Sequence, residues 1–264
     1  MVWRKGNEGD EPGSAQTPAG RHFQRDMEAL WGDVLKQAAL VETALQSSIH
    51  ALCHGRPDLA AAVRDGEPQI NSNQVRIERE CLKMLALHQP VATDLRRVAA
   101  LLKINNELER MADLAEHIAR RSLKLVGKPI PMAVLEHLDA LGAEATELVR
   151  NGLDAMSRSD ASLARSVIDS DRAIDRRSRL ILKELKRAIR DEPERVTTWL
   201  RLINTSRNLE RIADHATNIA EGVIYIREGD IYRRGDLEPA RSPSRSPTAV
   251  APGPGPDGTS GGDR

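Results

Sequence analysis

Aromatic side chains are scarce in this chain. Only six of its 264 residues are aromatic, namely Trp3, Phe23, Trp31, Trp199, Tyr225 and Tyr232. A core must therefore be built from Leu, Ile, Val, Ala and Met. The scarcity also removes the stacking platforms on which many proteins bind single-stranded nucleic acid. The formal net charge of +0 points the same way, because dedicated nucleic-acid binders are usually basic. We expect no nucleic-acid partner.

Cysteines and long apolar runs are also in short supply. Cys53 and Cys81 form no Cys-x-x-Cys motif and have no histidine at zinc-site spacing, which favours buried free thiols in a reducing compartment. The chain has no run of about 18 apolar residues, and its first residues lack the apolar segment of a secretory signal. We therefore expect a cytoplasmic protein that contacts membranes only peripherally.

Charged residues make up 30% of the chain, and aliphatic residues recur at helical spacing, which predicts an all-α protein. Proline and glycine breaks predict six helices, near residues 21–54, 57–88, 91–125, 131–157, 160–190 and 194–227. Within the second stretch, Asp65-Gly66-Glu67-Pro68 predicts a break, with Pro68 in the first turn of a longer helix. Three long helices per half, joined by short loops, predict two tandem antiparallel three-helix bundles.

An internal repeat is the strongest feature that is present. Residues 108–119 read LERMADLAEHIA and residues 209–220 read LERIADHATNIA, identical at eight of twelve positions. The chain is therefore an internal duplication. We expect a first three-helix repeat over 21–127 and a second over 128–232. The tails over 1–20 and 233–264 are rich in Gly, Pro and Ser, and we expect them to be disordered.

Each copy of the repeated phrase carries two carboxylates four residues apart, which lie one turn apart on one helix face. A third pair lies on the fifth stretch, and its counterpart on the second stretch is Glu67 with Asn71. Like charges at this spacing repel, so we expect a cation between them. Ligands that are all oxygen suit Mg²⁺, Mn²⁺, Ca²⁺ or iron. The predicted metal ligands are Glu109, Asp113, Glu210, Asp214, Asp171, Asp175 and Glu67.

Two alternatives to a metal site stay open. The same acids can be neutralised by arginines, which are plentiful on these stretches: Arg96, Arg97, Arg110, Arg176, Arg179 and Arg211. His117 and His215 are either additional ligands or ordinary histidines on a helix surface. A ferritin-like di-iron site is disfavoured because Ala112 and Ala213 occupy the positions where its Glu-x-x-His motif needs histidine.

Catalytic signatures are missing. The chain has no Gly-rich phosphate loop, no Ser-His-Asp or Cys-His arrangement and no Glu-His zinc helix, so we expect no enzyme. The alternative function is a metal-dependent phosphohydrolase or a metal-storage bundle, because carboxylates that hold two metals can hydrolyse phosphoesters.

The repeated Leu-Glu-Arg-x-Ala-Asp phrase resembles the PhoU family of bacterial regulators of phosphate uptake. The segment Gln89-Pro90-Val91-Ala92-Thr93-Asp94-Leu95-Arg96 resembles the family's QPVAxDLR turn and helix start. The match extends from residue 22 to about residue 228. The resemblance implies two PhoU-like bundles, similar to spectrin repeats, that commonly form homodimers. It also implies iron, zinc, Mn²⁺ or Mg²⁺ bound through Glu/Asp-x-x-x-Asp motifs, which Glu67 and Asn71 match only in part.

The function that this resemblance implies is regulatory. Such proteins are thought to act as adaptors between the ATPase subunit of the phosphate ABC transporter and a membrane sensor histidine kinase. In that position they keep the phosphate-starvation response off when phosphate is abundant.

Overall fold

The computed structural model describes residues 18–229. Within that range the chain forms six α-helices and one short 3₁₀ turn. They are α1 (Pro18–Cys53), α2 (Pro57–His88), α3 (Ala92–Leu123), α4 (Met132–Arg158), α5 (Ala161–Asp191), η1 (Pro193–Arg195) and α6 (Val196–Glu228). The bounds confirm the predicted stretches to within three residues at each end. Because α1 begins at Pro18, the tail predicted over 1–20 is too long by three residues, and its remainder and 233–264 lie outside the described range.

Local chemistry explains where the helices begin and end. α2 starts at Pro57, whose missing N–H costs nothing in the first turn of a helix. It ends at His88, and the following cap residue Gln89 is left-handed, donates its N–H to the Leu85 carbonyl and directly precedes Pro90. α5 begins after Asp160, whose carboxylate accepts hydrogen bonds from the backbone N–H groups of the next turn.

The predicted break at Asp65-Gly66-Glu67-Pro68 is wrong, because α2 runs through Pro68 without interruption. A proline inside a helix removes one backbone hydrogen bond and crowds the preceding turn. Val63, Ile70 and Ile77 are spaced seven residues apart on both sides of Pro68, and all three are buried. Their continuous apolar face packs into the first bundle. This packing outweighs the local preference for a break.

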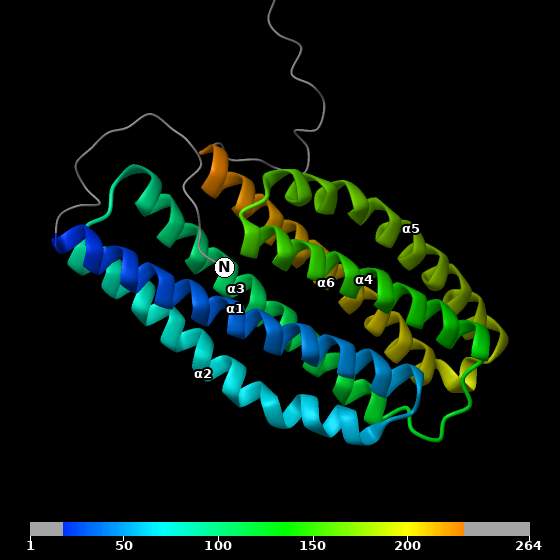
Figure 1. Cartoon of the computed structure of the whole chain (residues 1–264). Helices are drawn as coiled ribbons and strands as arrows, with labels where there is room; N and C mark the ends of the chain where they lie inside the picture. The colour runs from blue at the N-terminus through cyan, green and yellow to red at the C-terminus, as the bar shows by residue number, and fades with distance from the viewer. Residues whose placement is uncertain (1–17, 230–264) are drawn as a thin grey trace, which may run out of the picture. The chain divides into compact units, whose positions relative to one another are not determined.

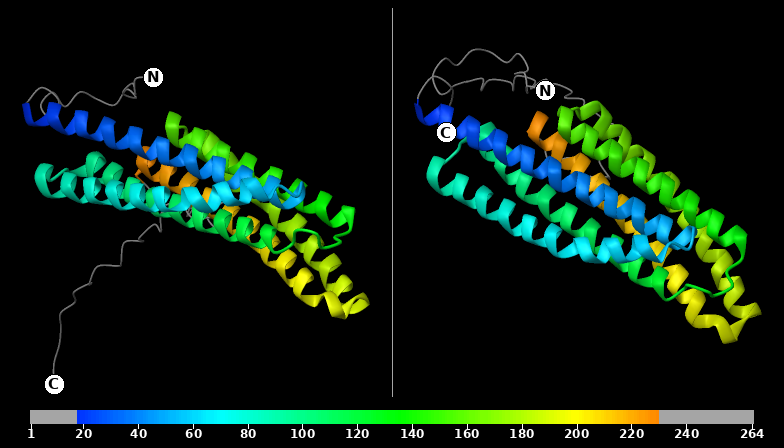
Figure 2. Two further views of the ribbon diagram at one scale, coloured as in Figure 1. Left: turned by 90° about the horizontal axis from the view of Figure 1, so that it is seen from below. Right: turned by 60° about the horizontal axis from the view of Figure 1, so that its bottom comes forward.

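The helices pack as two groups of three. α1, α2 and α3 all contact one another, and so do α4, α5 and α6 (Figure 1). α3 also packs along α6, and α1 contacts α4, so these two pairs join the halves. Figure 2 shows the same side-by-side arrangement of the helices from two other directions. The predicted pair of three-helix bundles is confirmed.

The interior is aliphatic, as the composition requires. Two aromatic side chains are also buried: Phe23, and Trp199, whose ring nitrogen donates a 3.3 Å hydrogen bond to the Glu192 carbonyl. Cys81 is buried and Cys53 half-buried, and burial raises the pKa of each thiol to about 12. Among residues 18–229, no helix has the length and apolar character to cross a bilayer.

Candidate functional site

The second bundle brings two predicted acid pairs to one helix interface. Asp171 is buried on α5, and Glu210 on α6 is half-buried. Ser178 of α5 donates a 2.8 Å hydrogen bond to Glu210, and its hydroxyl lies 3.3 Å from that of Ser206. Because α5 and α6 run antiparallel, this register places Asp175 opposite the α6 turn that carries Glu210 and Asp214.

The first bundle repeats this arrangement on α2 and α3. Gln74 occupies the place of Ser178, and its side-chain nitrogen lies 3.3 Å from the Asn106 oxygen. Asn105 donates a 2.9 Å bond to the Gln74 carbonyl. The same antiparallel register then places Glu67 and Asn71 opposite the α3 turn that carries Glu109 and Asp113. Glu67 accepts a 2.5 Å hydrogen bond from Asn71, so the amide partly satisfies this carboxylate.

Glu109 and Asp113 are a strained pair. Burial and then the neighbouring Asp113 raise the pKa of Glu109 above its ordinary value. Arg110 offsets this only in part, because its side chain is 64% exposed and its guanidinium lies 3.5 Å from Glu109. Folding therefore costs free energy when both carboxylates are ionised, and a cation beside them would recover it.

The ion pairs that Arg110 and Arg179 form with the predicted acids are long and largely exposed. Arg179 lies 3.9 Å from Asp175, and its side chain is 73% exposed. Arg97 instead pairs with Asp94, at 3.2 Å, away from the acid faces. Exposed pairs at such distances contribute little to stability. The contacts of Arg97, Arg110 and Arg179 therefore do not account for the acid pairs.

The donor atoms of these faces suit a metal ion, but their present geometry does not. Carboxylate, amide and hydroxyl oxygens are the ligands that hard cations prefer. Within residues 18–229, however, no three His, Cys, Asp or Glu side chains converge closely enough to hold an ion. The predicted ligands thus share two helix interfaces without forming a coordination shell. The metal site stays a prediction.

His215 has a different role from either one predicted. It is half-buried where α6 meets α3, and its Nδ1 lies 2.6 Å from Glu107 of α3. Asn218 donates a second hydrogen bond of 2.9 Å to the same oxygen. Burial opposes ionisation of Glu107, but these two bonds outweigh it and hold the pKa of its carboxyl below the ordinary value. His215 is thus part of a clasp between the two bundles.

The sequence does not indicate the clasp, because Glu107 precedes the repeated phrase and has no acidic counterpart. In the duplication Glu107 corresponds to Asn208, and His215 corresponds to Leu114. Asn208 also reaches α3, where its side-chain oxygen accepts a 2.7 Å hydrogen bond from Arg121. Glu107 and Asn208, which are equivalent in the duplication, thus each contact the other bundle. Only the pairing of α3 with α6 reveals this, since the sequence does not state which helices of the two repeats touch.

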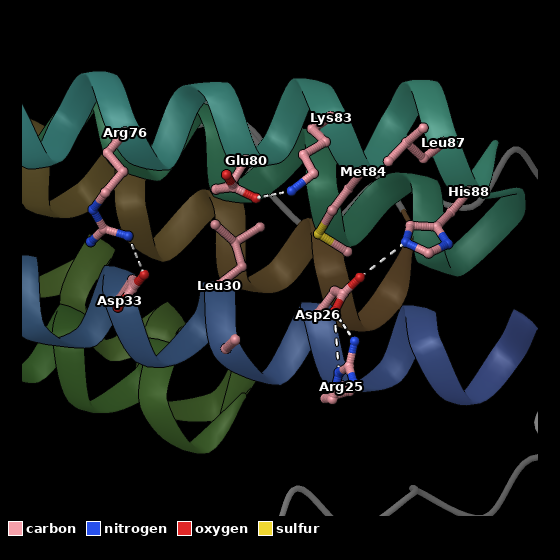
Figure 3. A pocket seen from close by; sticks show the side chains of 11 residues that line it. Arg25, Asp26, Leu30, Asp33, Arg76, Glu80, Lys83, Met84, Leu87 and His88 are labelled. Carbon is pink, nitrogen blue, oxygen red and sulfur yellow. Dashed lines mark hydrogen bonds and ion pairs between the residues drawn. The ribbon is translucent and has the colours of Figure 1, made fainter.

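A pocket of about 380 Å³ lies between α1 and α2 (Figure 3). Leu30 and Met84 supply apolar atoms, and charged side chains surround them. These charges are largely satisfied by one another: Arg76 with Asp33, Lys83 with Glu80, and both Arg25 and His88 with Asp26. Because its charges are already paired, this pocket is a weaker candidate than the acid faces.

Comparison with known proteins identifies the family. The family model for the PhoU domain matches residues 34–122 and 138–223, one copy in each bundle. The chain is 35% identical over 213 residues to the "Phosphate-specific transport system accessory protein PhoU homolog" of Pseudomonas aeruginosa, covering 81% of this chain and 88% of that protein. The homologue of Aquifex aeolicus is 34% identical over 214 residues, covering 81% and 96%.

Solved structures agree with the sequence matches. The crystal structure of PhoU from Pseudomonas aeruginosa superposes with a TM-score of 0.76 at 35% identity, covering 79% of this chain and 100% of that one. The phosphate transport system regulatory protein PhoU from Streptococcus pneumoniae gives a TM-score of 0.74 at 26% identity, covering 80% and 99%. With both bundles matched in sequence and in fold, this chain belongs to the PhoU family.

Proposed function

We propose that this protein is an accessory regulator of phosphate transport. The observation that supports the proposal is the match of both bundles to the PhoU domain, with relatives described as accessory proteins of phosphate-specific transport systems. The charge-rich outer faces of the six helices suit a protein that acts through contacts with other proteins. In this proposal the protein is cytoplasmic, forms a homodimer and meets membranes only through its partners.

The finer role proposed is that of an adaptor and negative regulator. It would connect the ATPase subunit of a phosphate ABC transporter to a membrane sensor histidine kinase and keep the starvation response off at high phosphate. Deletion of the gene in its host, followed by phosphate uptake and a starvation-promoter reporter, tests this role. We expect the reporter to be active at high phosphate in the deletion strain. A reporter that stays silent would contradict the proposal.

A metal-dependent phosphohydrolase is the competing function, and the four acids along α5 and α6 are its only support. Purified protein loaded with Mn²⁺ or Fe²⁺ and given p-nitrophenyl phosphate separates the two. We expect no turnover above that of the Asp171→Asn variant. If wild type turns over the substrate and this substitution abolishes the turnover, the protein is an enzyme and the adaptor proposal is wrong.

A further inference from the structure

Three large apolar side chains are exposed on the outer side of α2 and α3. Val75 and Leu82 of α2 are 41% and 53% exposed, and Leu95 of α3 is 45% exposed. Val75 and Leu82 are seven residues apart, so they share one side of α2. Leu95 lies eleven residues, or about three turns, before Asn106, on the side of α3 that reaches Gln74 of α2. We name these three residues the α2–α3 strip.

The second bundle is an internal control for the strip. α2 and α5 align so that buried Ile70 and Ile77 correspond to buried Ile174 and Ile181. In that alignment Val75 corresponds to Arg179 and Leu82 to Lys186, and both of these are exposed. The third strip position is apolar in both halves, with Val196 matching Leu95. The bundle fold therefore tolerates charged residues at these two positions. The apolar side chains of Val75 and Leu82 are not needed for folding, which indicates another role.

Charge identifies what covers the strip. Away from the α2–α3 turn, the same two helix faces continue into the carboxylates of Glu67, Glu109 and Asp113. A partner must therefore be apolar at one end and basic at the other. A second copy that docked through the same strip would supply more carboxylates, not the basic side chains that these acids attract. An anionic membrane surface would be repelled by the same acids.

We propose that the α2–α3 strip docks a basic amphipathic helix of a partner protein. The partner's apolar side chains would cover Val75, Leu82 and Leu95, and its Lys or Arg side chains would reach Glu109 and Asp113. α2 and α3 run side by side, as a helix-in-groove contact requires (Figure 2). The inference rests on the proposed adaptor function and gives it one surface and one partner chemistry.

A synthetic helix tests the chemistry directly. The probe is a fluorescent peptide of about 20 residues with leucines at i, i+3, i+4 and i+7 and lysines on the flanking positions. A matched peptide has glutamates in place of the lysines. Binding to the full chain is measured by anisotropy with a chelator present, so that a metal cannot bridge the acids. Val75→Arg with Leu82→Lys transfers the residues of the second bundle onto the strip. Leu180→Arg removes an exposed leucine elsewhere and is the control.

We expect the double variant to bind the lysine peptide at least about tenfold more weakly than wild type, because each covered Val or Leu is worth about that factor. The control variant should bind the lysine peptide as tightly as wild type does. The glutamate peptide should bind neither wild type nor the double variant. Equal binding by wild type and the double variant overturns the proposal. Equally tight binding of the glutamate and lysine peptides to wild type would also overturn it. A lower oligomeric mass of the double variant would assign the strip to a second copy, and loss of binding to anionic vesicles would assign it to a membrane.

Expression of the double variant in the deletion strain separates this inference from the proposed function. If the variant restores repression fully, the docking inference fails and the regulatory function stands. If deletion itself leaves the reporter silent, the regulatory function fails, whatever the peptide shows.

Discussion

Glu107 and Glu109 lie two residues apart on α3, yet the fold shifts their acidities in opposite directions. Glu107 accepts hydrogen bonds from His215 and Asn218, which lower its pKa in spite of burial. Glu109 is half-buried beside Asp113, and both its partial burial and this neighbour raise its pKa. Folding therefore favours the ionised form of the first and the protonated form of the second. The Glu107 carboxylate joins the two bundles, whereas the Glu109 carboxylate is repelled by Asp113.

Glutamine at each position should reveal this difference. Glu107→Gln should lower the free energy of unfolding at neutral pH by about 1 kcal/mol. That loss should shrink as the pH falls through the ordinary glutamate value of about 4.3 toward the folded pKa, because the wild type then loses the same interaction. Glu109→Gln should raise stability at neutral pH by a few tenths of a kcal/mol and lose this advantage at low pH. Urea denaturation across that range measures both, and effects of the same sign would contradict the assignment.

Asp214→Asn distinguishes a metal from arginine as the partner of the acid faces. If a metal binds there, the variant should bind Mn²⁺ or Fe²⁺ more weakly, while stability in chelator stays equal or rises by a few tenths of a kcal/mol. If a buried arginine held Asp214, the substitution would cost about 3 kcal/mol or more with or without metal. Chemical denaturation in chelator and in added metal distinguishes these outcomes. A large loss that is independent of metal would end the metal hypothesis for the second bundle.

At the scale of elements, α2 shows a local signal overruled by packing. Gly66 and Pro68 together are typical of a helix boundary, yet the buried residues before and after them keep one helical period. Elsewhere the helices end or begin where the local sequence predicts, as at Gln89-Pro90 and Asp160. The difference is that α2 carries a continuous apolar face through the proline. A sequence shows both signals, but only the packed bundle shows which one has the larger free energy.

Pro68→Ala should therefore stabilise the protein. Pro68 is exposed, so alanine fills no cavity and removes no contact with the core. It restores a backbone hydrogen bond, and the gain is reduced by the greater freedom of the unfolded chain. We expect a net gain of about 1–2 kcal/mol in the free energy of unfolding by urea. Gln69→Ala is the control at the adjacent exposed site and should change it little. Equal effects of the two substitutions would show that α2 is kinked or frayed at Pro68 in solution.

At the scale of the whole molecule, the duplication made the architecture predictable and left the joint between the bundles unpredicted. The repeated phrase and the regular breaks are enough to expect two three-helix bundles and to place seven acids on two equivalent faces. The clasp of Glu107 with His215 was not predictable, because α3 and α6 are about a hundred residues apart and the bundle pattern fits several ways of pairing the halves. The α2–α3 strip was also not predictable, because the sequence does not state which apolar side chains are exposed.

The contact of α1 with α4 offers a test of the joint. A Cβ added at Gly142 of α4 would lie 2.7 Å from Cγ2 of Ile49 on α1, which is closer than carbon atoms can pack. Ile49 is buried, and its branched side chain has few other rotamers, so the helices must separate slightly. Gly142→Ala should therefore destabilise the protein by about 1–3 kcal/mol. Gly32→Ala, in an open position within α1, should instead stabilise it by up to about 1 kcal/mol.

A double-mutant cycle shows whether the loss arises at this contact. Ile49→Ala alone should cost about 2–5 kcal/mol, because it leaves a cavity in the core. In its presence Gly142→Ala should cost little or nothing, since the new methyl group then occupies part of that space. Urea denaturation of the four proteins gives the coupling energy. If the two losses simply add, α1 and α4 do not meet at these residues, and the halves are joined through α3 and α6 alone.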